Sequence, residues 1–191
     1  MTVEGNPYQL YADEFTDDDF PELIHFNCGD DFSWGRAATE WITGSDVRDS
    51  MARRGTRVWL YRNDAGVLVG FGALGMTRRR WPPPGGGFSN LVIIPMLGID
   101  RHFHRQPPAP HTKYSHQILG HLVYEAYRWL LTEKSKSTLP LLILYVHRDN
   151  EFAIKLYERF GFVQEREVMR GDHFLMSLHI GLEDAQSDVD A

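Results

Sequence analysis

The spacing of apolar positions changes repeatedly along the chain, and each change marks an expected element of secondary structure. Runs rich in β-branched and aromatic residues predict two hairpins, with strands over 57–62 and 67–74 and over 163–168 and 173–180. A continuous apolar run over 141–146 predicts a buried strand. Apolar residues that recur every three or four positions predict helices over 16–28, 118–130 and 150–160, and one or two short helices over 37–42 and 47–54. Helices and strands are interspersed, which indicates a mixed α/β domain.

Proline and glycine mark the breaks between these elements. The run PPPGGG at 82–87 predicts a loop. The apolar strand expected over 88–99 contains Pro95 and Gly98, and because proline has no N–H for a ladder we expect an edge or a bulge there. The polar connection over 101–115 is long for a compact domain, and loops of that length are usually functional or disordered.

The length of 191 residues is enough for one domain with a substantial core. We expect a single domain over 1–182 and a flexible acidic tail over 183–191. The first residues show no secretory signal, and no apolar run is long enough to span a bilayer. Cys28 is the only cysteine, which excludes an intramolecular disulfide and favours a reducing cytoplasm. Neither CxxC pairs nor an HExxH sequence is present, so we expect no metal site.

The formal net charge of the chain is −6. This charge argues against nucleic acid as a partner, because nucleic-acid binding relies on basic surfaces, and it slightly favours cationic substrates. Three arginines, Arg78 to Arg80, are expected in an exposed turn. Four basic residues could contact phosphates or lie in a solvated loop: Arg101, His102, His104 and Arg105.

The most informative stretch of the chain covers residues 145–162 and reads YVHRDNEFAIKLYERFGF. A buried strand leads into a series of spaced positions: Asn150, Ala153, Leu156–Tyr157 and Gly161–Phe162. This series resembles the C-terminal motif of the GNAT superfamily of N-acetyltransferases, a strand followed by N-x-x-A-x-x-L-Y-x-x-x-G-F. The resemblance implies that acetyl-CoA is the co-substrate.

The resemblance also implies a GNAT-like α/β (α+β) fold. We expect a mixed, mostly antiparallel twisted sheet flanked by helices on both faces. The strands near 88–99 and 141–146 should be parallel neighbours, because a helix crosses between them.

Ala153 and Tyr157 are four residues apart and therefore share one face of the expected helix. A tyrosine hydroxyl can protonate a departing thiolate, which is the catalytic role that we expect of Tyr157. The alternative is a packing role, like that of its apolar neighbours in the helix. Asn150 is expected to cap the helix, and the resemblance adds a hydrogen bond to the pantetheine arm of CoA. It places Ala153 and Tyr157 at the same cofactor site.

The resemblance further predicts that CoA phosphates bind at the start of the helix after the long polar connection. Aligning 118–123 with the pattern G-x-G-x-x-L matches Gly120 to the last glycine, with Ile118 replacing the first and Ser115 replacing Arg or Gln. A shifted alignment reads Gln117 and Gly120 as Q-x-x-G. The predicted phosphate-site residues are Lys113, Ser115, His116, Gln117, Ile118, Leu119, Gly120 and His121.

The segment Met96–Arg101 resembles the fourth strand of the family, which splays from its neighbour and leaves backbone groups for the pantetheine arm. Leu97 and Ile99 are the cofactor-binding residues predicted there. Pro95 and Gly98 agree with such a break, and a plain β-bulge is the alternative.

The attacking amine must lose a proton, and Glu40, Asp100 and His147 are the candidate bases. We expect an N-acetyltransferase that moves acetyl from acetyl-CoA, by direct attack, to a primary amine of a small molecule or peptide. No membrane partner is expected, and homodimerisation is left open. The alternatives are a non-catalytic CoA-binding or protein-interaction module and an aminoacyl-tRNA-acetylating toxin, against which the negative charge argues.

Overall fold

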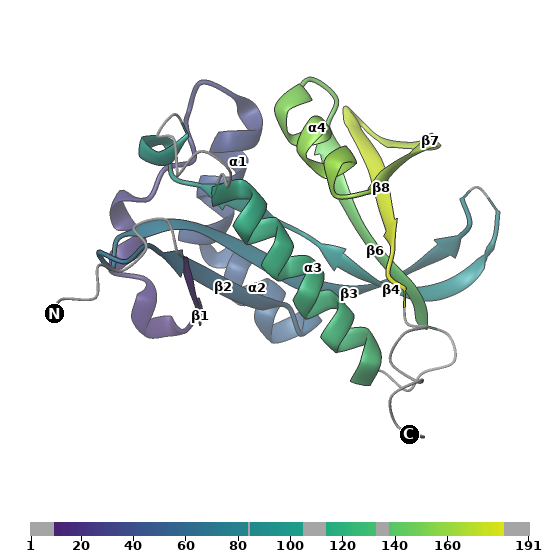
Figure 1. The fold of residues 1–191 in the computed structure, drawn as a ribbon, viewed down its shortest axis with the longest axis horizontal. Helices are drawn as coiled ribbons and strands as arrows, with labels where there is room; N and C mark the ends of the chain where they lie inside the picture. The colour runs from purple at the N-terminus through teal and green to yellow at the C-terminus, as the bar shows by residue number, and fades with distance from the viewer. Residues whose placement is uncertain (1–9, 84, 105–113, 133–137, 182–191) are drawn as a thin grey trace, which may run out of the picture. The chain divides into compact units, whose positions relative to one another are not determined.

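The computed structural model describes residues 10–83, 85–104, 114–132 and 138–181 (Figure 1). The first described elements are β1 (Tyr11–Glu14), the 3₁₀ turns η1 (Asp17–Asp19) and η2 (Glu22–His25), α1 (Ser33–Thr43), α2 (Ser45–Arg54), β2 (Arg57–Arg62) and β3 (Leu68–Trp81). The remaining elements are β4 (Gly87–Ile94), β5 (Leu97–Ile99), η3 (Arg101–Phe103), α3 (Tyr114–Thr132), β6 (Thr138–His147), α4 (Glu151–Arg159), β7 (Val163–Arg170) and β8 (His173–His179). Within these ranges no helix is long and apolar enough to cross a membrane.

The strands follow the order β1-β2-β3-β4-β6-β8-β7, and β5 pairs with β3. The chain forms two compact units. Unit 1 contains 1–75 and 95–122, and unit 2 contains 76–94 and 123–191, so β3 contributes residues to both. The single domain expected over 1–182 stays a prediction, and the tail over 183–191 lies outside the described residues.

Unit 1 is an antiparallel arrangement in which β2 pairs with β1 and β3, and β3 pairs with β5. Successive side chains of β3 point to opposite faces. Phe71 stacks on Trp41 of α1, with ring centroids 5.8 Å apart. On the other face, a methyl group added at Gly72 would lie 2.8 Å from Leu122 Cδ1 of α3. Helices therefore cover both faces of the sheet in unit 1, as the sequence predicts.

In unit 2, β4 pairs with β6 in parallel, through Ile93 opposite Ile143 and Ile94 opposite Leu144. The predicted parallel pair is thus confirmed for β4, and the crossover by α3 explains why the chain returns in the same direction. β8 pairs with β6 and with β7, both times antiparallel. Since β4–β6 is the one parallel pair among the described ladders, the mixed, mostly antiparallel fold class is confirmed.

The single helix expected over 16–28 is wrong, because the chain forms the two turns η1 and η2 there. Pro21 has no N–H to continue a helical ladder, and it stands directly before η2. The expected exposed turn at Arg78–Arg80 is also wrong, since these residues belong to β3. Strand β1 has no counterpart among the sequence-based expectations.

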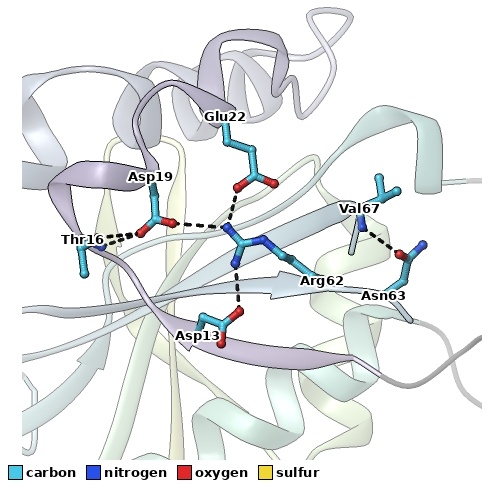
Figure 2. Close-up of polar contacts among 7 residues, drawn as sticks. All are labelled: Asp13, Thr16, Asp19, Glu22, Arg62, Asn63 and Val67. Atoms are coloured by element: carbon cyan, nitrogen blue, oxygen red, sulfur yellow. Dashed lines mark hydrogen bonds and ion pairs between the residues drawn. The ribbon is translucent and has the colours of Figure 1, made fainter. Parts of the chain in front are cut away.

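A cluster of three carboxylates around Arg62 holds β1, η1 and η2 against β2 in unit 1 (Figure 2). The Arg62 guanidinium donates to Asp13 at 3.0 Å, to Asp19 at 3.3 Å and to Glu22. The Glu22 hydrogen bond, and then the charges of all three acids, raise the pKa of Arg62 above its ordinary value. The Arg62 side chain is 19% exposed and that of Asp19 23%, so this ion pair is less screened than one between surface side chains, whereas Asp13 is 65% exposed.

We expect Arg62→Gln to lower the free energy of unfolding by about 1–2 kcal/mol, because three carboxylates then face one another without a cation. Urea denaturation at low and high NaCl measures this loss, which should shrink as salt screens the repulsion. Arg148→Gln is the matched control, since Arg148 is 53% exposed and its contacts with Asp149 and Asp172 are 3.7 and 3.5 Å long. Equal effects of the two substitutions would contradict a structural role for the Arg62 cluster.

Candidate active site

The turn from β6 into α4 is held by Asn150. Its side-chain oxygen accepts the backbone N–H of Ala153 at 3.2 Å, which is a helix N-cap bond. Gly161, with φ of 88°, follows the last turn of the helix in the left-handed conformation that favours glycine. The cap predicted at Asn150 is confirmed, and it leaves both amide N–H donors of Asn150 outside the cap bond.

Tyr157 lies on α4 one turn after Ala153. Its side chain is buried, and its ring lies 5.8 Å from that of Phe162. Loss of solvent on burial raises the pKa of Tyr157 to about 12. The hydroxyl therefore stays protonated at neutral pH, as a proton donor must. The predicted acid role of Tyr157 stays a prediction.

The predicted break at Pro95 separates two pairings of the chain. The β4–β6 ladder extends to Ile94 opposite Leu144, and after Pro95 the pairing that remains in β5 is with β3, which also neighbours β4. Met96 C=O accepts from Ala73 at 3.0 Å, and Asp100 N–H donates to Val69 at 2.8 Å.

The backbone N–H and C=O groups of alternate residues in a strand point to opposite edges. Those of Leu97 and Ile99 therefore point away from β3. The Ile99 carbonyl bonds to His104 Nε2 at 2.8 Å. Of the two predicted pantetheine contacts, Ile99 therefore already has a partner for its carbonyl.

The start of α3 differs from the sequence-based expectation. The helix begins at Tyr114, four residues before the predicted start, so Gly120 and His121 lie inside it. Ser115, Ile118 and Leu119 are buried, and Lys113 lies outside the described residues. The predicted phosphate contacts of Ser115, His116 and Gln117 at this helix stay predictions.

His121 packs inside unit 1. Its Nδ1 lies 2.9 Å from the Tyr61 hydroxyl, and its ring meets those of Trp59 and Tyr61 edge-on, with centroids 5.6 Å away. Its predicted role at the cofactor stays a prediction.

The three candidate bases have different surroundings. Glu40 is exposed on α1. His147 Nδ1 accepts the backbone N–H of Asp149 at 3.2 Å, so the neutral ring carries its proton on Nε2 and is a donor there.

Asp100 is buried, and its carboxylate accepts from Asn27 N–H at 3.0 Å and from His102 N–H at 2.9 Å. Its Oδ1 also lies 2.7 Å from His102 Nδ1. Because an ionised carboxylate only accepts, His102 Nδ1 donates to it, and in the neutral form of this exposed ring Nε2 is then the nitrogen without a proton. Sequence reasoning placed His102 among residues for phosphates and missed this pairing, which the spacing Asp-x-His could have indicated.

The candidate residues thus form two sets. The unit 2 set contains the cap Asn150, Ala153 and Tyr157 of α4, and His147 at the end of β6. The unit 1 set lies on β5, on the turn after it and on the first turns of α3, with Glu40 on α1. Across the described part of the chain, no three His, Cys, Asp or Glu side chains are placed to hold a metal ion.

No protein-family model matches the chain, and no curated protein sequence matches it. Solved structures do. The toxin AtaT complexed with acetyl-methionyl-tRNAfMet is similar with a TM-score of 0.62 and 18% identity, over 90% of this chain and 95% of that chain. A tyrosine-to-phenylalanine mutant of AtaT, bound to acetyl-CoA and the C-terminus of the antitoxin AtaR, has a TM-score of 0.62 and 17% identity, over 89% and 92%. The KacTA–DNA complex has a TM-score of 0.61 and 18% identity, over 90% and 93%.

These likenesses show that the chain has the GNAT fold, which confirms the resemblance drawn from residues 145–162 at the level of the fold. They also correct one expectation. The negative net charge argued against nucleic acid as a partner, yet one similar structure is a tRNA complex and another is a DNA complex. Net charge was a poor guide because binding depends on where charges lie on the surface rather than on their sum.

Proposed function

We propose that the chain is an acetyl-CoA-dependent N-acetyltransferase. The observation that carries the proposal is the arrangement on α4 within a GNAT fold. Asn150 caps the helix with two amide donors left over, and Tyr157 keeps a buried, protonated hydroxyl one turn after the small residue Ala153. Similar structures bound to acetyl-CoA support the choice of acyl donor.

The donor groups of the chain fit acetyl-CoA. The Leu97 backbone can pair with the amides of a pantetheine arm, as in strand addition. The positive end of the α3 helix dipole suits phosphates. Each group offers what one part of the co-substrate needs.

Acetyl-CoA supplies a thioester carbonyl that an amine can attack. The ammonium form of the acceptor first gives a proton to a base, for which Glu40, Asp100 with His102, and His147 stay the candidates. The amine lone pair then forms the C–N bond while the C–S bond breaks. The Tyr157 hydroxyl protonates the departing thiolate and recovers a proton from the acylated nitrogen.

For the acceptor we propose the amino group of an aminoacyl-tRNA. The similarity to AtaT complexed with acetyl-methionyl-tRNAfMet favours it, since that complex combines an acetylated amine with tRNA. Free amino acids, polyamines, aminoglycosides and peptide N-termini are the comparison acceptors, because they carry the same nucleophile without the RNA.

Calorimetry with acetyl-CoA, followed by CoA release with each acceptor, tests both levels of the proposal. We expect acetyl-CoA to bind and aminoacyl-tRNA to give the highest kcat/KM. Absence of binding at millimolar acetyl-CoA would overturn the enzyme proposal and favour a protein-interaction module. Binding without turnover of any acceptor would favour a non-catalytic CoA-binding module, and faster turnover of a free amine would overturn the choice of tRNA.

A further inference from the structure

Two exposed arginines flank one exposed phenylalanine where β3 and β4 lie in unit 2. The guanidinium carbons of Arg78 and Arg80 lie 5.5 and 5.0 Å from the ring centroid of Phe88, within cation–π distance. The Phe88 side chain is 57% exposed. We call these three residues the Arg–Phe–Arg platform.

Strand geometry holds the platform in place. Arg78 and Arg80 are two residues apart in β3 and therefore point to the same face, while Arg79 points to the other. Arg79 is half-buried, donates to the Tyr145 hydroxyl and lies 5.5 Å from the centroid of that ring. The contacts of Arg79 with Tyr145 hold this part of β3 in place. Arg78 and Arg80 therefore point to the opposite face from a fixed strand, and no loop has to become ordered for them to do so.

The strands around the platform carry no acidic residue. No Asp or Glu occurs between Asp64 and Asp100, although the whole chain has a net charge of −6. Strand β6, the next strand after β4, has none either. The charges of Arg78 and Arg80 are therefore not neutralised by any side chain of these three strands.

An exposed ring with two guanidinium groups close to it suits a ligand that combines flat rings with anions. Single-stranded nucleic acid has both, since its bases stack on aromatic side chains and its phosphates bind arginine. An acidic peptide offers charge without stacking bases. We infer that the Arg–Phe–Arg platform binds single-stranded RNA and, if the proposed function holds, contacts the tRNA that carries the acceptor amine.

Fluorescence anisotropy with the full chain tests the inference without any need for acetyl transfer. The probes are a labelled short oligouridylate and labelled polyglutamate, which has charge but no bases. We expect Phe88→Leu to weaken oligouridylate binding about tenfold and to leave polyglutamate binding unchanged, because only stacking is lost. The double variant Arg78→Gln with Arg80→Gln should weaken binding of both probes and reduce the salt dependence by about one counterion per arginine.

Arg148→Gln is the control, since it removes an exposed arginine of the same unit that already faces Asp149 and Asp172. Oligouridylate binding that Phe88→Leu leaves intact would overturn the inference. The inference would also be overturned if a platform variant changed the mass of the protein in ultracentrifugation and left its RNA affinity unchanged. The platform would then join copies of the chain. RNA binding without CoA release would overturn the proposed function alone, and CoA release without RNA binding would overturn this inference alone.

Discussion

Replacing Tyr157 with phenylalanine should lower kcat by about one to three decades and leave KM for acetyl-CoA almost unchanged. The substitution removes one hydroxyl and keeps the buried ring, so packing against Phe162 is preserved. Without the hydroxyl the thiolate departs unprotonated, and the transition state loses the stabilisation that a general acid supplies. Steady-state kinetics with the best acceptor of the panel measures both constants.

The pH profile gives a second readout for Tyr157. A general acid works while it is protonated, that is, below its pKa, and burial raises the pKa of Tyr157 to about 12. Ionisation of Tyr157 should therefore cause no loss of kcat between about pH 7 and 10. Tyr124→Phe is the control, because it removes a hydroxyl from an exposed ring on α3 and should not change kcat. If Tyr157→Phe folds and turns over at the parental rate, the tyrosine is a packing residue.

Adding one methyl group at Gly70 should lower the free energy of unfolding by about 2–3 kcal/mol. The new carbon would lie 2.5 Å from the Gly98 carbonyl oxygen and 2.9 Å from Ile118 Cδ1. The first contact is with backbone, so a side-chain rotation cannot relieve it, and β5 must shift away from β3. Since Ile99 pairs with Gly70, we also expect weaker acetyl-CoA binding through the displaced β5.

Urea denaturation of three glycine variants separates this effect from a general cost of alanine. Gly72→Ala should lower the free energy of unfolding less than Gly70→Ala does, because the nearest atom to the new carbon is the flexible end of Leu122 at 2.8 Å. Gly87→Ala meets nothing within 4 Å and should change stability by less than about 0.5 kcal/mol. Similar denaturation midpoints for Gly70→Ala and Gly87→Ala would show that β3 and β5 are not closely packed.

The elements that could be predicted from the sequence are those that depend on residues close together in the chain. Helix α4 was predicted almost to its ends, since the cap at Asn150 and the stop at Gly161 act on their own turns. The hairpin signals and the buried run of β6 were equally reliable. By contrast, Arg78–Arg80 looked like an exposed turn because three consecutive charges rarely suit a strand interior. The structure places them in β3, where Arg79 donates a hydrogen bond to the hydroxyl of Tyr145, a residue of β6 that lies sixty-six positions later in the chain.

By itself the sequence determined the mixed α/β class, the β6–α4 segment and the candidate acid Tyr157. These depend on periodicity, capping and residue chemistry within short stretches of chain. Only the tertiary structure decided which polar side chains are hydrogen-bonded within the protein and which are exposed to a ligand. Asp100 is bound by the Asn27 backbone, seventy-three residues away, and the arginines of β3 flank a ring from β4. Such contacts join distant segments, and folding alone brings them within hydrogen-bonding and stacking distance.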